Sequence, residues 1–129
     1  MPPDNPTTVG PGIDVSFPQD NTATTGITRI SNSSFNLSEI GTYLIIFQVG
    51  VDEAGQLLLT LNDEDLEYTV VGRAAGTSQI IGNTLITTTT ENSVLTVRNP
   101  ADNTTALTIT PLAGGTRPVS AHLTIIQIA

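Results

Sequence analysis

Few residues of this sequence have the types and spacing that catalysis requires. His122 is the only histidine, and cysteine is absent. A Ser-His-Asp triad needs a histidine beside an activated serine and an orienting carboxylate, yet the sequence contains no Gly-x-Ser-x-Gly nucleophile turn. No histidine and cysteine set has the spacing of metal ligands. We therefore expect a protein that is not an enzyme, with no catalytic, cofactor-binding or metal site and no cofactor.

One acidic run has residue types that can bind a cation. The stretch NDEDLEY places Asp63, Glu64, Asp65 and Glu67 close together, and carboxylate oxygens are the ligands that Ca²⁺ prefers. The run lacks the spacing and the glycine of an EF-hand loop, and it lies where a hairpin turn is expected. A solvated turn is the preferred interpretation, and a calcium site is the open alternative.

The composition excludes two classes of partner. The 129 residues, enough for a single domain, include four arginines, no lysine and twelve acidic residues, which gives a net charge of −8. The chain cannot neutralise a run of phosphates, so we expect neither nucleic acid nor a membrane surface as a partner. No segment approaches the ~20 apolar residues of a membrane span, and the first residues do not resemble a signal peptide.

Short apolar segments separated by turn residues predict an all-β fold. Val, Ile, Leu and Thr are abundant and suit a pleated sheet, and strands spaced by about 8–12 residues are typical of a sandwich or barrel. The expected strands are at 13–17, 27–30, 34–37, 42–51, 56–62, 66–71, 78–88, 93–98, 105–111 and 119–128. Residues 1–12, MPPDNPTTVGPG, are expected to be an extended or disordered lead-in outside the core, either a linker or a docking peptide. Residues 13–129 form the expected domain.

Two of these strands are apolar on both faces. Residues 42–51 place Tyr43, Ile45 and Phe47 on one face and Leu44, Ile46 and Gln48 on the other. In the strand at 119–128, the face that carries His122 becomes apolar towards the C-terminus. An antiparallel sheet usually covers one face with its partner sheet and leaves the other to water. A second apolar face therefore predicts a neighbouring subunit.

The same stretches resemble a known family. GTYLIIFQV resembles the central strand of tumour necrosis factor and C1q-like jelly rolls, whose pattern runs Gly-x-Tyr-Leu-Ile-x-x-Gln-Val. SFNLSEIG and AHLTIIQI are similar to the approach to that strand and to the terminal strand of the same fold. The chain as a whole, which is Thr-rich and Lys-free with a VGPG lead-in, most resembles the C-terminal head of collagen-like spore-surface (exosporium) glycoproteins of spore-forming bacteria. The resemblance covers about residues 13–129.

The resemblance implies an antiparallel two-sheet jelly-roll sandwich of about ten strands that assembles as a homotrimer. The implied trimer-interface residues are Leu44, Ile46, Gln48, Ile81 and His122. Aromatic residues that commonly fill the axis of this family are replaced by Ile46 and His122, and a long Gly-x-y tract is absent. Three copies of His122 at the axis would place like charges together below about pH 6.5 and loosen the trimer.

The expected function is therefore structural. The resemblance implies a homotrimeric surface-display head that caps a collagen-like stalk or filament, outside the cell, on a bacterial spore surface or at an appendage tip. Its partner would be itself, with docking of residues 1–12 to other spore-coat or filament proteins as an open possibility. The alternative is a ligand- or host-binding module that acts through the jelly-roll loops. Exposed aromatics or paired charges at the loop tips would favour that alternative.

Overall fold

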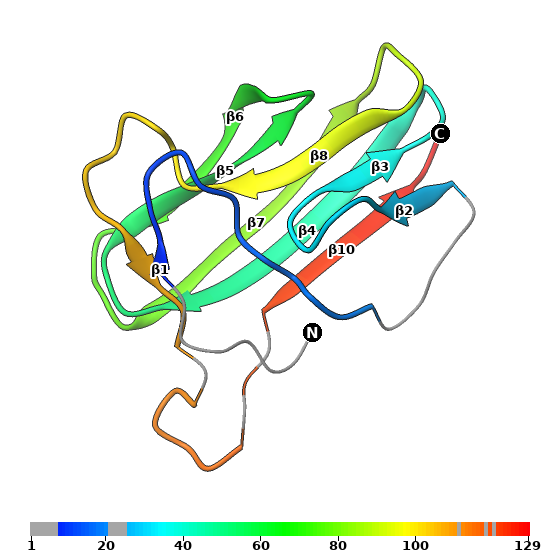
Figure 1. The fold of residues 1–129 in the computed structure, drawn as a ribbon. Coiled ribbons are helices and arrows are strands. Elements are labelled where there is room, and N and C mark those ends of the chain that lie inside the picture. Colours follow the sequence, from blue (N-terminus) through cyan, green and yellow to red (C-terminus); the bar gives the residue numbers. More distant parts are fainter. Residues whose placement is uncertain (1–7, 21–25, 111, 118, 120) are drawn as a thin grey trace.

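The structure is a computed structural model that describes residues 8–20, 26–110, 112–117, 119 and 121–129. Within these residues it is all-β, with ten strands, no helix and antiparallel pairing throughout (Figure 1). The sheets stack as a sandwich and do not close into a barrel. The predicted fold class, an antiparallel two-sheet jelly-roll sandwich, is confirmed.

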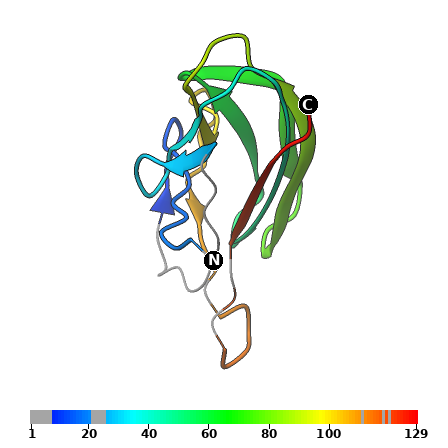
Figure 2. The same ribbon diagram turned by 90° about the vertical axis from the view of Figure 1, so that its right-hand side faces the viewer.

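The strands follow one another along the chain with short connections. Their bounds are β1 (Thr8–Val9), β2 (Ile27–Arg29), β3 (Phe35–Leu37), β4 (Thr42–Val51), β5 (Gly55–Leu61), β6 (Glu64–Arg73), β7 (Ser78–Thr87), β8 (Ser93–Arg98), β9 (Leu107–Thr108) and β10 (His122–Gln127). One sheet has the order β10-β4-β7, and the other has the order β2-β3-β8-β5-β6. A two-stranded ribbon joins β1 to β9. Figure 2 shows the two layers edge on, with β4, β7 and β10 in one layer and β2, β3 and β8 in the other.

β4 is the central strand of the three-stranded sheet, and its alternation sets the core. Tyr43, Ile45 and Phe47 are at most 1% exposed and point between the sheets. Gly82 on β7 lies opposite Phe47, and a Cβ atom on Gly82 would lie 2.2 Å from the Phe47 ring. The position therefore excludes a side chain, because the buried ring occupies that space.

The acidic run begins at the hairpin turn that the preferred interpretation predicted, between β5 and β6, and its members Glu64, Asp65 and Glu67 lie on β6. Asn62 and Asp63 both have positive φ angles, 52° and 67°, which is the geometry of a two-residue hairpin loop. Asn62 also fixes the turn against β8, because its side-chain oxygen accepts from the Val94 amide at 2.9 Å. Further along the same hairpin, the β5–β6 register shifts between Leu57 and Leu59.

Three predicted segments differ from the structure. Residues 13–17 form a single bridge, Asp14 with Arg98, in place of a strand. The segment is extended and buries Val15 and Phe17, but its amides bond to two different partners, so no ladder propagates. The predicted strand at 105–111 narrows to β9 and one further bridge at Ile109, and the predicted strand at 119–128 narrows to β10.

The lead-in also differs where it is described. Thr8 and Val9 pair with β9, and Val9 is 4% exposed within the core. The expectation that residues 1–12 stay outside the core is therefore wrong for Val9, whose side chain fills a site beside β9. Residues 1–7 lie outside the described residues, and the domain boundary at residue 12 stays a prediction.

Candidate functional site

The predicted interface residues lie together on the outer surface of the three-stranded sheet. Strand register places them in cross-strand rows, because side chains on paired Cα atoms share a face. The rows, read from β10 through β4 to β7, are His122–Gln48–Ile81, Thr124–Ile46–Asn83 and Ile126–Leu44–Leu85. We call these nine residues the open face. All five predicted residues belong to it.

The open face is apolar and in contact with solvent in the single chain. Leu85 is 51% exposed, and Ile81 and Ile126 are each 46% exposed. On the central strand, Leu44 and Ile46 are half-buried by their neighbours. None of the nine residues is an acid or an arginine, although the chain carries twelve acidic residues. A contiguous apolar patch of this kind marks an interaction surface or an aggregation risk.

The predicted set leaves out four members of this face, of which Leu85 and Ile126 are apolar and Asn83 and Thr124 are polar. Leu85 lies four residues after Ile81, and Ile126 lies four residues after His122. In a strand, residues an even number apart share a face, so this spacing could have added both to the interface set. The even spacing was visible in the sequence, and using it required only the assumption that both strands are regular.

One polar member of the open face, Gln48, makes a side-chain hydrogen bond along the sheet. Gln48 Nε2 donates to Gln79 Oε1 at 2.8 Å, which joins β4 to β7 at the end of the face. Among the described residues, His122 makes no hydrogen bond with a serine or a carboxylate. The arrangement therefore offers a binding surface and contains no nucleophile–base pair.

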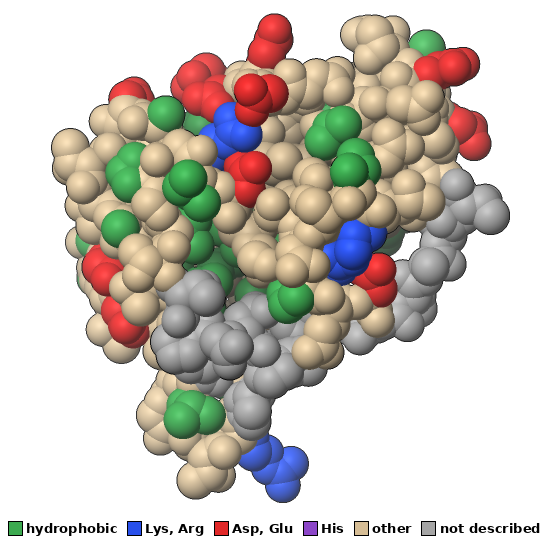
Figure 3. Space-filling model, viewed as in Figure 1, with side chains coloured by type: hydrophobic (Ala, Val, Ile, Leu, Met, Phe, Trp, Pro, Cys, Tyr) green, Lys and Arg blue, Asp and Glu red, His purple; other side chains and the backbone are tan. Residues whose placement is uncertain are grey.

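The outer surface of the five-stranded sheet has a different character. We call its outward residues on β5 and β8 the closed face: Gln56, Leu58, Thr60, Val94, Thr96 and Arg98. The hydroxyls of Thr60 and Thr96 bond to each other, and Leu58 is only 1% exposed. The loop after β8 lies against this face, since Asn103 donates to the Gln56 side chain at 3.3 Å. Figure 3 shows a largely uncharged surface on this side, with acidic groups spread around its edges.

Arg98 completes the closed face through two carboxylates. Its Nε lies 2.7 Å from Asp14 Oδ1, and its Nη2 lies 2.7 Å from Asp63 Oδ1. The hydrogen bond that Arg98 donates to the Asp14 carboxylate is the main cause that raises the pKa of Arg98 further above its usual value. Asp63, one of the four candidate calcium ligands, is thus held by an arginine.

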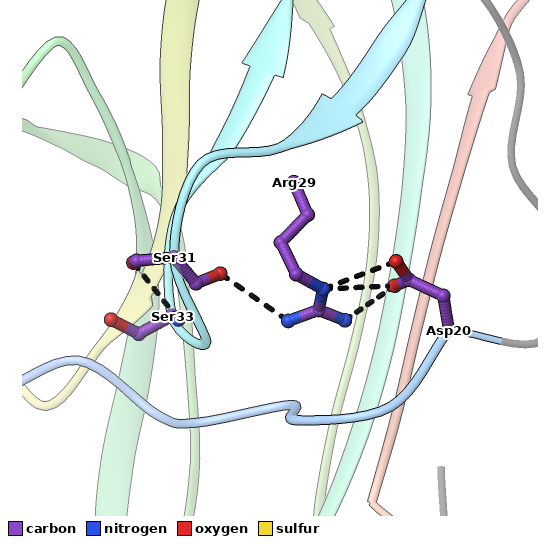
Figure 4. A network of polar contacts seen from close by, with 4 residues as sticks. All are labelled: Asp20, Arg29, Ser31 and Ser33. Atoms are coloured by element: carbon purple, nitrogen blue, oxygen red, sulfur yellow. Dashed lines mark hydrogen bonds and ion pairs between the residues drawn. The ribbon is translucent and has the colours of Figure 1, made fainter.

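Arg29 makes a second acid pair, shown in Figure 4. Its Nε donates to Asp20 Oδ2 at 3.1 Å, its Nη2 pairs with Asp20 Oδ1, and its Nη1 donates to the Ser31 carbonyl at 3.3 Å. The hydrogen bond from Arg29 lowers the pKa of Asp20. The guanidinium also lies 5.1 Å from the Phe35 ring centre, a cation–π distance. These contacts fix β2 against the preceding segment and leave no phosphate-binding fork.

The remaining acidic groups do not form a metal site in the described part of the chain. Asp65, Glu67 and Asp102 border a shallow hollow on the closed face, together with Leu58 and Pro100. No three His, Cys, Asp or Glu residues among those described are placed to hold a metal ion. The described residues also include no helix long and apolar enough to cross a membrane.

No protein-family model matches the sequence, and a search of curated proteins finds no similar sequence. The resemblance to C1q-like and tumour necrosis factor-like heads therefore stays a prediction.

Proposed function

We propose that this protein is a non-enzymatic head domain that forms a homotrimer through the open face. The supporting observation is the charge distribution. Copies of a chain with net charge −8 repel one another, yet the nine residues of the open face carry no carboxylate. Two copies can meet there without placing acid against acid, and Leu44, Ile46 and Leu85 gain burial when they do. Each such side chain contributes on the order of 1.5–3 kcal/mol when fully buried.

The biological setting in this proposal rests on the sequence resemblance. We propose that the trimer caps a collagen-like stalk or filament on the outside of a bacterial spore, where it would hold three chain ends together. The alternative of a loop-mediated binding module has less support. Among the described residues, the only exposed large aromatic side chain is Tyr68, which lies on strand β6 and not at a loop tip.

The mass of the protein in solution tests the proposal. Light scattering of the wild-type chain is expected to give three times the 13.5 kDa chain mass. Ile46→Asp places a carboxylate in the centre of the open face, where burial without a partner is costly, and is expected to give single chains. Wild-type protein that stays a single chain at high concentration would contradict the proposal.

A matched control uses the closed face. Val94 is half-buried on β8 and points outward, as Ile46 does on β4. Val94→Asp is expected to keep the trimer mass, because that face contacts no second copy. The stalk role is tested by fusing a Gly-Pro-Pro tract before residue 8 and measuring triple-helix melting. The wild-type head should raise the melting temperature and the Ile46→Asp head should not.

A further inference from the structure

Tyr68 is the most exposed large hydrophobic side chain of the described residues, at 65%. It belongs to β6, in the other sheet, yet its hydroxyl donates to the Leu85 carbonyl on β7 at 3.3 Å. A second bond of the same kind runs from Arg73 Nε to the Gln79 carbonyl at 2.9 Å. Side chains of β6 therefore bond to the main-chain edge of β7, and Tyr68 lies beside the open face.

The register shift between β5 and β6 explains why the Tyr68 side chain points to β7. Leu59 pairs with Leu66, but Leu57 pairs with Val71, so β6 has extra residues around Tyr68. Thr69 fixes this bulge, because its hydroxyl donates to the Leu66 carbonyl at 2.6 Å and accepts from the Leu59 amide at 2.8 Å. Bulges commonly redirect a side chain. Here the bulge directs Tyr68 to β7, away from Glu67, which lines the hollow on the closed face.

The open face thus extends over a fourth strand and has two unlike flanks. The row Ile126–Leu44–Leu85 continues to Tyr68 through the hydroxyl contact. We call Tyr68, Ile81 and Leu85 the tyrosine flank. We call Ile126 and Ile128, which is 53% exposed, the isoleucine flank.

We infer that the tyrosine flank of one chain packs against the isoleucine flank of the next copy. This inference rests on the proposed trimer. Identical chains around a threefold axis make head-to-tail contacts, so each chain must present two different patches that fit each other. The two flanks meet this need, because one offers a tyrosine and the other offers branched aliphatic side chains. A tyrosine held at its hydroxyl loses little further freedom on burial, which suits an interface anchor.

Cysteine cross-linking tests the contact in a chain that has no cysteine of its own. Tyr68→Cys and Ile126→Cys are made singly and together. Within one chain the two positions lie about three strand spacings apart, roughly 14 Å, beyond the reach of a disulfide. Oxidation of the double variant is expected to give covalent trimers on a non-reducing gel, and neither single variant should cross-link. Cross-linked dimers from a single variant would overturn the inference.

A second pair of variants covers the case in which cross-linking fails. Tyr68→Ser should weaken trimer assembly by at least about tenfold, and Tyr68→Phe, which keeps the ring, should change it by about threefold or less. If the wild type is a trimer and Tyr68→Ser assembles equally well, this inference is wrong and the proposed function stands. If the wild type is a single chain, both are wrong.

Discussion

The two outer faces of the sandwich have the same strand geometry, but their outward side chains make different contacts. On the closed face, Thr60 bonds to Thr96, Arg98 pairs with two carboxylates, and a loop lies against Gln56. On the open face, five of the nine residues are aliphatic, and no described segment of the chain covers them. The polar groups of the closed face find partners within one chain. The apolar side chains of the open face stay exposed to water unless another surface covers them.

This difference shows which face of a strand gives information about function. Both sheets place apolar side chains inward, so the core alone does not distinguish them. The outward residues do, because the polar groups of the closed face find partners within the chain, whereas Leu85 and Ile126 stay exposed to water at a cost in free energy. The outward residues of each strand, read as a set, therefore separate a surface whose groups are paired within one chain from a surface suited to a partner.

The largest expected effect compares one leucine from each face. Leu58→Ala removes a side chain that is 1% exposed on the closed face, and we expect it to lower the free energy of unfolding by about 2–5 kcal/mol at every protein concentration. Leu44→Ala is expected to cost less, and its cost should grow with protein concentration as the wild type assembles. Urea unfolding at several concentrations measures both. A concentration-independent loss for Leu44→Ala would argue that its own chain covers it.

The next effect concerns the hydroxyl pair of the closed face. Thr60→Val leaves the Thr96 hydroxyl, which is 5% exposed, without its partner, and should destabilise the fold by about 1–3 kcal/mol. The double variant Thr60→Val with Thr96→Val removes both hydroxyls and should be close to neutral. Thermal unfolding of the three proteins forms the test. Equal losses from each single change that add in the double variant would show that the pair is not coupled.

The same contrast explains which features the sequence predicts well. β4 and β8 match their predicted bounds, because each has regular alternation between turn residues. The Asn62–Asp63 turn follows from residue types that tolerate positive φ. β1 could not be predicted, since two residues in a proline-rich stretch become a strand only through β9, far along the chain. Tyr68 could not be placed either, because a bulge redirects its side chain and strict alternation does not reveal bulges.

A smaller effect is expected at Glu53, where low pH should change the stability of the folded chain and not the assembly of chains. The Glu53 carboxylate accepts hydrogen bonds from the Thr108 backbone amide at 2.6 Å and from the Thr108 hydroxyl at 2.8 Å, and the hydrogen bond from the amide is the main cause that lowers the pKa of Glu53. A lowered pKa in the folded state stabilises the fold above the unfolded-state value, and that contribution is lost as the pH falls through the folded-state value. We expect Glu53→Gln to cost about 1 kcal/mol at pH 7 and less at pH 3, where protonation of the wild-type carboxylate weakens its hydrogen bonds. Unfolding at the two pH values measures this, and an equal loss at both would contradict it.

The smallest effect is expected on the open face, at His122. Its row contains Gln48 and Ile81, neither of which carries a charge that could pair with an imidazolium. Lowering the pH from 8 to 5 favours the protonated imidazole, so a trimer that brings three copies of His122 together would place like charges side by side. Where water screens them, two like charges about 4 Å apart repel by about 1 kcal/mol, which weakens assembly without unfolding the chain. Sedimentation across this range should show the trimer dissociating at a higher protein concentration at pH 5 than at pH 8. The shift should be absent in His122→Gln, and a shift of the same size in that variant would assign the pH dependence to other groups.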